Sequence, residues 1–227
     1  MTDNPLRPAR MPVIPSGPAY GWMARVNGRS SDLNRIELNP ERRELLTSWT
    51  AKEFVVSALR ITGIVLSASA LEKCAAHVAT QDANLSPEER SCAGLFAAFD
   101  ALEKEARANG QQATVTADDF LRLYDLLNGG GSGAKSGIDG PQSKAEETAK
   151  ATLERSCLWW TADSFRELHP VEQAALVHLR LIDLKVFGGL TSQMAFLASS
   201  LFLLRSTLPP LIISESAINA YLSALDE

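Results

Sequence analysis

The chain has 227 residues, of which 45% are hydrophobic and 22% charged, and this length and composition allow one globular core. Its formal net charge is −5, and its Lys and Arg residues are scattered singly, without the basic stripe that binding to nucleic-acid phosphates requires. Nucleic acid is therefore not an expected partner. The longest apolar run, 194–204, is also too short to span a membrane, which takes about 20 residues.

Residues 1–40 are expected to form a Pro-rich N-terminal arm. Five prolines fall before position 19 and another closes the segment (Pro5, Pro8, Pro12, Pro15, Pro18 and Pro40). Because proline lacks a backbone N–H and clashes with the preceding helical turn, this density disfavours helix. The apolar residues Tyr20, Trp22, Met23 and Val26 indicate that part of the arm docks, either on its own domain or on a second copy.

Residues 41–227 are expected to form one all-α domain, because apolar residues recur there at helical spacing. A hydroxyl residue stands three positions before a carboxylate at Ser69, Ser86 and Ser143, a pattern that predicts capping boxes at helix starts. No period-two alternation is long enough for a sheet, although a small β-hairpin flap could form in residues 129–142 or in the arm. Helices are predicted near 41–61, 68–80, 87–108, 117–128, 144–160, 170–184, 192–206 and 215–226.

The segment 128–140 (NGGGSGAKSGIDG) is a low-complexity linker, and its glycines predict a mobile loop. Residues 129–136 (GGGSGAKS) nearly match a phosphate-binding P-loop. Ala134 stands where that motif needs glycine, and a predicted helix rather than a strand precedes the segment. A surface loop is therefore the better interpretation.

The three histidines, His77, His169 and His178, have no histidine partner four residues away and no cysteine at metal-ligand spacing. No metal site is therefore predicted. His178 falls on the periodic face of its helix, where a core position is expected. A Ser-His-Asp triad stays open because triads are defined by geometry, but no G-x-S-x-G motif occurs.

The cysteines are odd in number (Cys74, Cys92 and Cys157), and the N-terminus shows no signal-peptide pattern. Both features predict reduced, buried thiols rather than a disulfide framework. We therefore expect a cytoplasmic protein.

Several segments, in the right order, resemble the Fic (filamentation induced by cAMP) domain family. Residues 174–184 (AALVHLRLIDL) resemble its A-x-x-H approach helix, 196–205 its long apolar helix, and 208–213 (LPPLII) its L-P-P stop. Upstream, 57–67 (SALRITGIVLS) resembles the family's S-S-x-I-E-G-x-x-L-[ST] segment. The resemblance covers about residues 41–226 and implies a Fic-like helical fold.

The family's catalytic motif, H-P-F-x-[DE]-G-N-G-R-x-x-R, is degenerate here: residues 185–196 read KVFGGLTSQMAF, and only Phe187 matches. The resemblance places Lys185 at the catalytic histidine and Gly189 at the magnesium-binding acid. It places Gln193 and Phe196 at the two arginines. Lysine is a poor base near neutral pH, glycine offers magnesium no ligand, and neither arginine replacement carries charge for phosphate.

The resemblance also implies a vestigial inhibitory segment at Thr62 and Gly63, where Thr62 takes the place of a glutamate that inhibits some members. The candidate site is then a vestigial groove formed by Lys185, Phe187, Gly188, Gly189, Thr191, Ser192 and Gln193.

These losses favour a catalytically inactive Fic-like domain that needs no cofactor and binds a protein partner or a second copy of itself. The alternative is a divergent nucleotidyl (AMP) transferase that modifies protein hydroxyl groups with ATP and magnesium. In that enzyme Lys185 would bind phosphate, and Thr191 or Ser192 would add donors at a helix start. A third hypothesis is a helical enzyme unrelated to Fic, with a deep pocket lined by ionisable residues.

Overall fold

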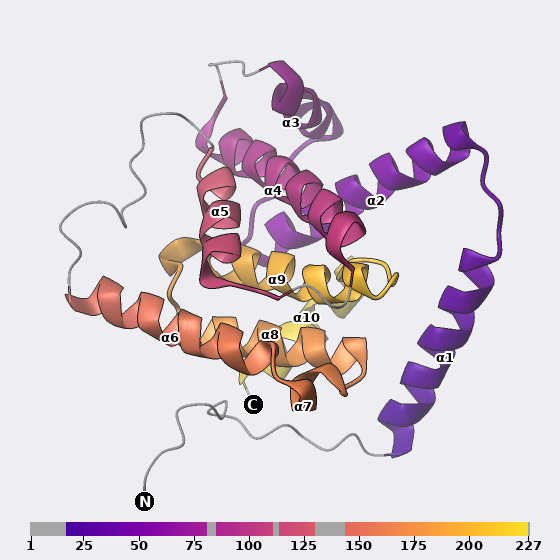
Figure 1. The fold of residues 1–227 in the computed structure, drawn as a ribbon. Coiled ribbons are helices and arrows are strands. Elements are labelled where there is room, and N and C mark those ends of the chain that lie inside the picture. The colour runs from indigo at the N-terminus through magenta and orange to yellow at the C-terminus, as the bar shows by residue number, and fades with distance from the viewer. Residues whose placement is uncertain (1–16, 81–84, 111–113, 130–143, 227) are drawn as a thin grey trace, which may run out of the picture.

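The computed structural model describes residues 17–80, 85–110, 114–129 and 144–226. These residues form ten α-helices and no strand, which confirms the all-α prediction (Figure 1). The helices are α1 (Gly17–Asn34), α2 (Pro40–Ile61), α3 (Ala68–Thr80), α4 (Pro87–Asn109), α5 (Ala117–Leu127), α6 (Lys144–Trp160), α7 (Asp163–Arg166), α8 (Pro170–Leu184), α9 (Thr191–Arg205) and α10 (Ile218–Asp226). Two 3-10 turns, η1 (Gly188–Leu190) and η2 (Glu215–Ala217), precede α9 and α10.

All eight predicted helices are present, with small differences at their ends. The expectation that prolines keep the N-terminal arm out of helix is wrong for α1. Pro18 lies in the first turn of α1, where its missing N–H has no helical partner to lose, and no proline occurs between Pro18 and Pro40. Pro40 begins α2, whereas the four prolines before residue 17, and the hairpin proposed for the glycine-rich loop, lie outside the described residues.

Local capping chemistry explains where several helices begin. Ser86 and Glu89 form the predicted capping box at the start of α4, with Ser86 Oγ accepting the N–H of Glu89 at 3.2 Å. The capping box predicted at Ser69 is wrong, because Ser69 already lies inside α3, which begins at Ala68, and Ser67 Oγ accepts the N–H of Ala70 instead. The box predicted at Ser143 lies outside the described residues.

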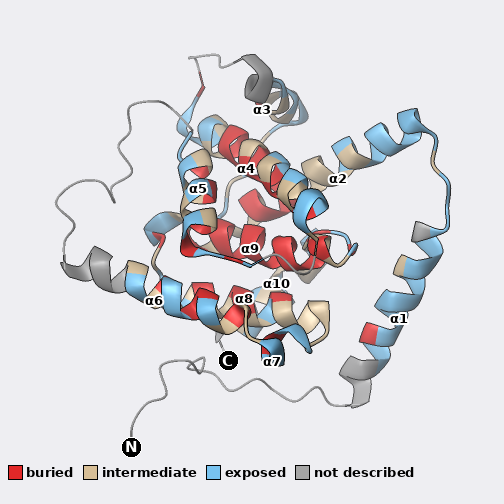
Figure 2. Cartoon of the chain, in the orientation of Figure 1, coloured by how far each residue is buried: buried red, intermediate tan, exposed pale blue. Residues whose placement is uncertain are grey.

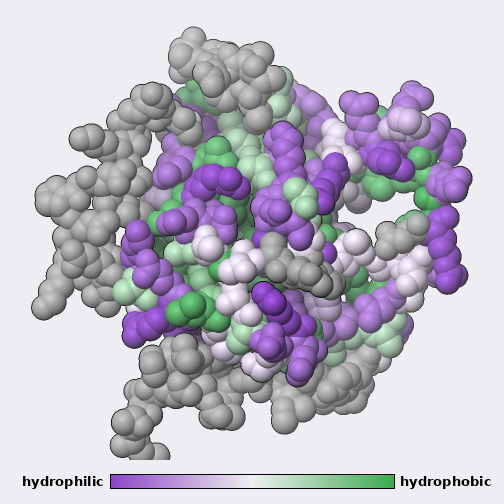
Figure 3. Space-filling model, viewed as in Figure 1, coloured by the Kyte–Doolittle hydropathy of each residue, from purple (hydrophilic) through white to green (hydrophobic). Residues whose placement is uncertain are grey.

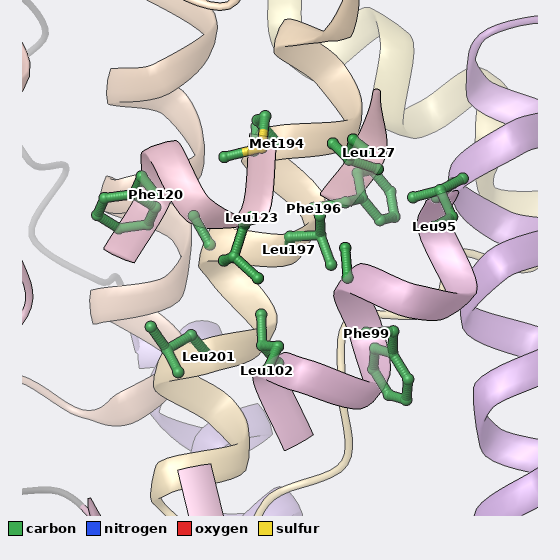
Figure 4. Packing of buried hydrophobic residues seen from close by; sticks show 14 of the residues in the cluster. Leu95, Phe99, Leu102, Phe120, Leu123, Leu127, Met194, Phe196, Leu197 and Leu201 are labelled. Atoms are coloured by element: carbon green, nitrogen blue, oxygen red, sulfur yellow. The ribbon is translucent and has the colours of Figure 1, made fainter. Parts of the chain in front are cut away.

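Helix α9 lies at the centre of the bundle. Only Ser192 and Leu204 of its fifteen residues are not fully buried, so Figure 2 shows it as the most completely buried helix near the middle. Helices α2, α4, α5 and α8 all pack against it. Figure 4 shows side chains of α9 gathered with those of α4 and α5 in one apolar cluster, including Leu102, Leu123, Leu197 and Leu201. A helix that is apolar all round requires this position.

The segment after α9 is held by buried serines rather than by a sheet. Ser57 Oγ of α2 accepts the N–H of Ile213 at 2.8 Å and donates to the Ile213 carbonyl at 3.2 Å. Ser200 Oγ of α9 accepts the N–H of Leu211 at 3.0 Å. These bonds satisfy backbone groups that helix and sheet would otherwise satisfy, so the Leu208–Ile213 segment can lie on the core without a partner strand.

None of the helices in the described part of the chain is both long enough and apolar enough to cross a membrane.

The contact between α4 and α5 depends on a glycine. A Cβ on Gly94 would lie 2.4 Å from the carbonyl oxygen of Leu127, which is backbone and cannot rotate away. We expect Gly94→Ala to lower the free energy of unfolding by about 1–3 kcal/mol, the usual cost of overpacking, as measured by chemical denaturation. The control is Gly28→Ala in α1, where an added Cβ meets nothing within 4 Å. An unchanged stability in Gly94→Ala would contradict the close approach of the two helices.

Candidate functional site

The loop between α8 and α9 forms a compact turn that uses its own backbone donors. Lys185 ends α8 in the left-handed conformation, with φ 52°, and Gly188 has φ 53°. The N–H of Gly188 donates to the Lys185 carbonyl at 3.3 Å, and the N–H of Leu190 donates to the Phe187 carbonyl at 3.0 Å. Both the N–H and the Oγ1 of Thr191 donate to the Gly188 carbonyl. Three of the loop's amides therefore have partners inside the loop.

The side chains of this loop point in different directions. Lys185, Gly188 and Gly189 are exposed, whereas Phe187 is buried with its ring centroid 5.4 Å from that of Tyr124 on α5. Phe187 therefore anchors the loop to the core, and Lys185 extends from it into solvent. These residues belong to one loop, but their side chains do not face a shared site.

The two positions that the resemblance assigns to arginines are part of the core. Gln193 is buried, and its Nε2 donates to Ser91 Oγ of α4 at 3.2 Å. Phe196 is fully buried, with its ring centroid 6.4 Å from that of Phe54 and 5.9 Å from that of Tyr221. Of the predicted groove residues, Gln193 and Phe187 thus serve packing, and Thr191 and Ser192 form the first turn of α9.

The fold of the chain is similar to that of solved structures. The chain matches a fragment of Fic-1 from C. elegans, residues 134–508, with a TM-score of 0.72 and 20% sequence identity, over 92% of this chain and 65% of that fragment. A single-residue variant of the same fragment matches with a TM-score of 0.70 and 20% identity, over 91% of this chain and 63% of the fragment. The chain has a Fic-like fold.

This Fic-like chain spans slightly less than two thirds of the length of the Fic-1 fragments that it matches. No protein-family model matches its sequence, and no curated protein matches it. At 20% identity the likeness concerns the fold, and the chemistry must be argued from the residues of this chain.

The predicted inhibitory segment has a structural role at the end of α2. The N–H of Ile64 donates to the Leu59 carbonyl and the N–H of Gly63 to the Arg60 carbonyl, both at 3.0 Å, with Gly63 at φ 78°. This is the Schellman pattern, in which glycine takes the left-handed position. Thr62 Oγ1 donates back to the Leu59 carbonyl at 2.7 Å. Both Thr62 and Gly63 are exposed, and their geometry is accounted for by the helix end.

His178 is a buried structural histidine, as predicted. Ser199 Oγ donates to the Ala195 carbonyl at 2.6 Å, so it accepts from His178 Nδ1 at 3.0 Å. Nδ1 then carries the proton, and Nε2 accepts from the Tyr221 hydroxyl at 2.8 Å. This chain of bonds joins α8, α9 and α10. Both ring nitrogens of His178 are thus occupied without a carboxylate, which is not the arrangement of a Ser-His-Asp triad.

The three cysteines are free and buried, as the sequence predicts. Burial raises the pKa of each thiol, and that of Cys157 rises to about 12. A thiol with such a pKa stays protonated and is a poor nucleophile. Within the described residues, no group of three or more His, Cys, Asp or Glu side chains is placed to hold a metal ion.

Sequence reasoning missed a cavity of about 230 Å³ at the C-terminal end of α9, lined by Trp160, Phe165 and Phe202 among others. The adjacent tryptophans Trp159 and Trp160 at the end of α6 were the only signal, and a buried aromatic pair at a helix end is usually core. The cavity exists because α6, α7, α8 and α9 meet there, which no local pattern encodes.

Burial lowers the pKa of His178 to about 4, from an ordinary value near 6.5, so the folded protein keeps this ring neutral where the unfolded chain protonates it. Since the unfolded state binds the extra proton, stability should fall as pH decreases from about 6.5 to about 4. The expected loss from this group is up to about 3 kcal/mol in the free energy of unfolding.

The measurement is chemical denaturation at several pH values in this range. His178→Gln should show a smaller pH dependence than the native chain. His169→Asn, which keeps a good N-cap residue at the start of α8, should retain the pH dependence. Equal pH profiles for the native chain and His178→Gln would show that His178 is not neutral in the folded state.

Proposed function

We propose that this chain is a Fic-like domain without transferase activity that works by binding protein, and that its preferred partner is a second copy of itself. The observation that carries the proposal is a set of large apolar side chains exposed on α1, on the connection after it and on the first half of α2. The set consists of Trp22, Val26, Leu33, Ile36, Leu45, Leu46 and Trp49, with exposed fractions from 37% to 66%.

Helix α1 has two distinct faces. Met23 is buried, Asn27 Oδ1 lies 3.0 Å from His169 Nε2, and Ser30 Oγ donates to the Thr207 carbonyl at 3.4 Å. At 100° per residue these three residues share one side of the helix, which faces the domain. Trp22, Val26 and Leu33 fall within about 40° of one another on a different side. This second stripe is apolar and faces solvent.

The first half of α2 continues the exposed apolar surface. Leu45 and Trp49, four residues apart, lie on one side of α2 and are 66% and 56% exposed. Figure 1 shows α1 at the edge of the bundle, with the start of α2 extending out to meet it. Hydrophobic residues interrupt the hydrophilic surface along this projecting part (Figure 3). Several large apolar side chains exposed on one projecting part are typical of a protein-binding site.

The charges of the projecting part favour a second copy over a strongly charged partner. Residues 21–53 carry nearly equal numbers of basic and acidic side chains, namely Arg25, Arg29, Arg35, Arg42, Arg43 and Lys52 against Asp32, Glu37, Glu41, Glu44 and Glu53. The chain as a whole has a net charge of −5. Two copies can therefore pair through this surface without the repulsion that the rest of the chain would produce.

The loop between α8 and α9 supports the absence of transferase activity. Phosphoryl chemistry depends on donors and cations arranged in advance around the phosphates. Here the amides of Gly188, Leu190 and Thr191 already donate within the loop, and Gln193 is committed to the core. Lys185 is the one cation in the loop, and its side chain is exposed.

For the noncatalytic part of the proposal, we expect no magnesium-dependent rise in melting temperature with ATP, CTP, GTP, UTP or their diphosphates. A ligand that binds the native state must raise the midpoint by mass action. A shift that requires magnesium and disappears in Lys185→Ala would instead establish nucleotide binding at the loop. Transfer of labelled nucleotide to protein above the Lys185→Ala control would contradict the proposal directly.

For self-association, we expect sedimentation equilibrium to show a dimer at micromolar concentrations. Trp22→Glu with Leu33→Glu should shift the protein to monomer, because charge on the apolar stripe of α1 must be desolvated to pair. Leu158→Glu is the matched control, since Leu158 is 66% exposed on α6, away from this surface. A native chain that stays monomeric at all concentrations would contradict self-association, and a dimer unaffected by the α1 substitutions would place the interface elsewhere.

A further inference from the structure

Helix α1 receives little support from the rest of the chain. Between residues 21 and 33, where its side chains are described, Met23 is the one buried residue and Ser30 is half-buried. Its side-chain hydrogen bonds to the domain come from Asn27 and Ser30. Within the described structure α1 packs along no other helix, and Figure 3 shows open space between the projecting part and the bundle. Tertiary packing therefore stabilises α1 far less than it stabilises α9.

The sequence of α1 does not favour an isolated helix either. Gly21 and Gly28 lie in its interior, and each makes helix roughly fivefold less favourable than alanine would. The first turn has no acidic side chain, and the last turn has no basic one but contains Asp32, so neither end complements the helix dipole. Even alanine-rich helices of about 12–15 residues are marginal in water. A glycine-containing helix of 18 residues therefore needs packing that one chain does not provide.

The exposed apolar stripe of α1 is the side on which that packing is missing. Trp22, Val26 and Leu33 are 63%, 37% and 63% exposed there. We infer that α1 is folded only in the dimer, and that its helix forms as the stripe is buried against α1 and α2 of a second copy. This inference rests on the self-association proposed above and adds that pairing and the folding of α1 are one step. The bundle around α9 does not depend on α1 and stays folded in the single chain.

Coupled folding has two consequences for the strength of the dimer. Ordering α1 in both copies opposes association, so the dimer is weaker than a preformed surface of the same size would give. A substitution that favours helix in α1 also tightens the dimer without touching the interface, because it raises the fraction of chains that are competent to pair.

Gly28 allows a substitution of this kind. At 100° per residue it lies about 130–140° from both the apolar stripe and the side that faces the domain. A Cβ added there meets nothing within 4 Å, so Gly28→Ala changes the helix preference alone. We expect Gly28→Ala to lower the dissociation constant of the dimer about 20-fold, because the roughly fivefold gain in helix applies to both copies. If α1 were already helical in the single chain, alanine would stabilise both states equally and leave the constant unchanged.

Ser223→Ala is the matched control. This exposed change on α10 also favours helix. Helix α10 is joined to His178 through Tyr221 within one chain, so it is folded in both states. The dissociation constant should therefore be the same as that of the native chain.

The test combines sedimentation equilibrium with hydrogen–deuterium exchange of the full chain, below and above the dissociation constant. We expect the amides of α1 to exchange with little protection in the single chain and to become protected in step with the dimer, whereas those of α9 are protected throughout. A dimer whose constant is unchanged in Gly28→Ala, with α1 protected in the single chain, would overturn the coupling and leave self-association in place. A chain that stays monomeric at all concentrations would overturn self-association, and the inference with it.

Discussion

The rest of the structure depends on the burial of α9 from every side. A helix with no solvent face must satisfy all its polar side chains inside the protein, because each unsatisfied group costs free energy that packing has to offset. Ser199 takes part in the bonds to His178 and Ala195, and Ser200 holds the returning segment at Leu211. The polar residues of α9 therefore determine which neighbours can pack against it.

The two ends of α9 differ in how closely the neighbouring elements pack around them. At the N-terminal end, Phe187 anchors a short turn whose amides bond within it, and the residues at the expected phosphate-binding positions are drawn into the core. At the C-terminal end, α6 and α7 do not fill the space beside Phe202, and a cavity with both aromatic and polar side chains in its lining remains. The frame is thus Fic-like, and the absence of transferase chemistry from its central loop is part of our proposal.

Much of the fold was predictable because its signals are local. The capping box at Ser86 and the apolar periodicity of α2, α4 and α8 depend on residues within a few positions of one another. The prediction that the N-terminal arm is not helical was wrong for α1. The prolines that disfavour helix end at Pro18, and the sequence from there to Asn34 contains no proline. The range of α3 was predicted correctly, but its capping residue was not, because Ser67 and Ser69 offer equivalent hydroxyls and only the observed backbone shows which one caps.

The sequence by itself determined that the chain is helical, that α9 must be buried, and that His178 belongs to the core, because periodicity and residue type decide these features locally. Only the tertiary structure decided that Gln193 faces Ser91, that α1 presents one stripe to the domain and another to solvent, and that Trp160 lines a cavity without an acceptor for its N–H. These features arise where helices far apart in the chain meet. Their geometry depends on interhelical packing, which no short stretch of sequence specifies.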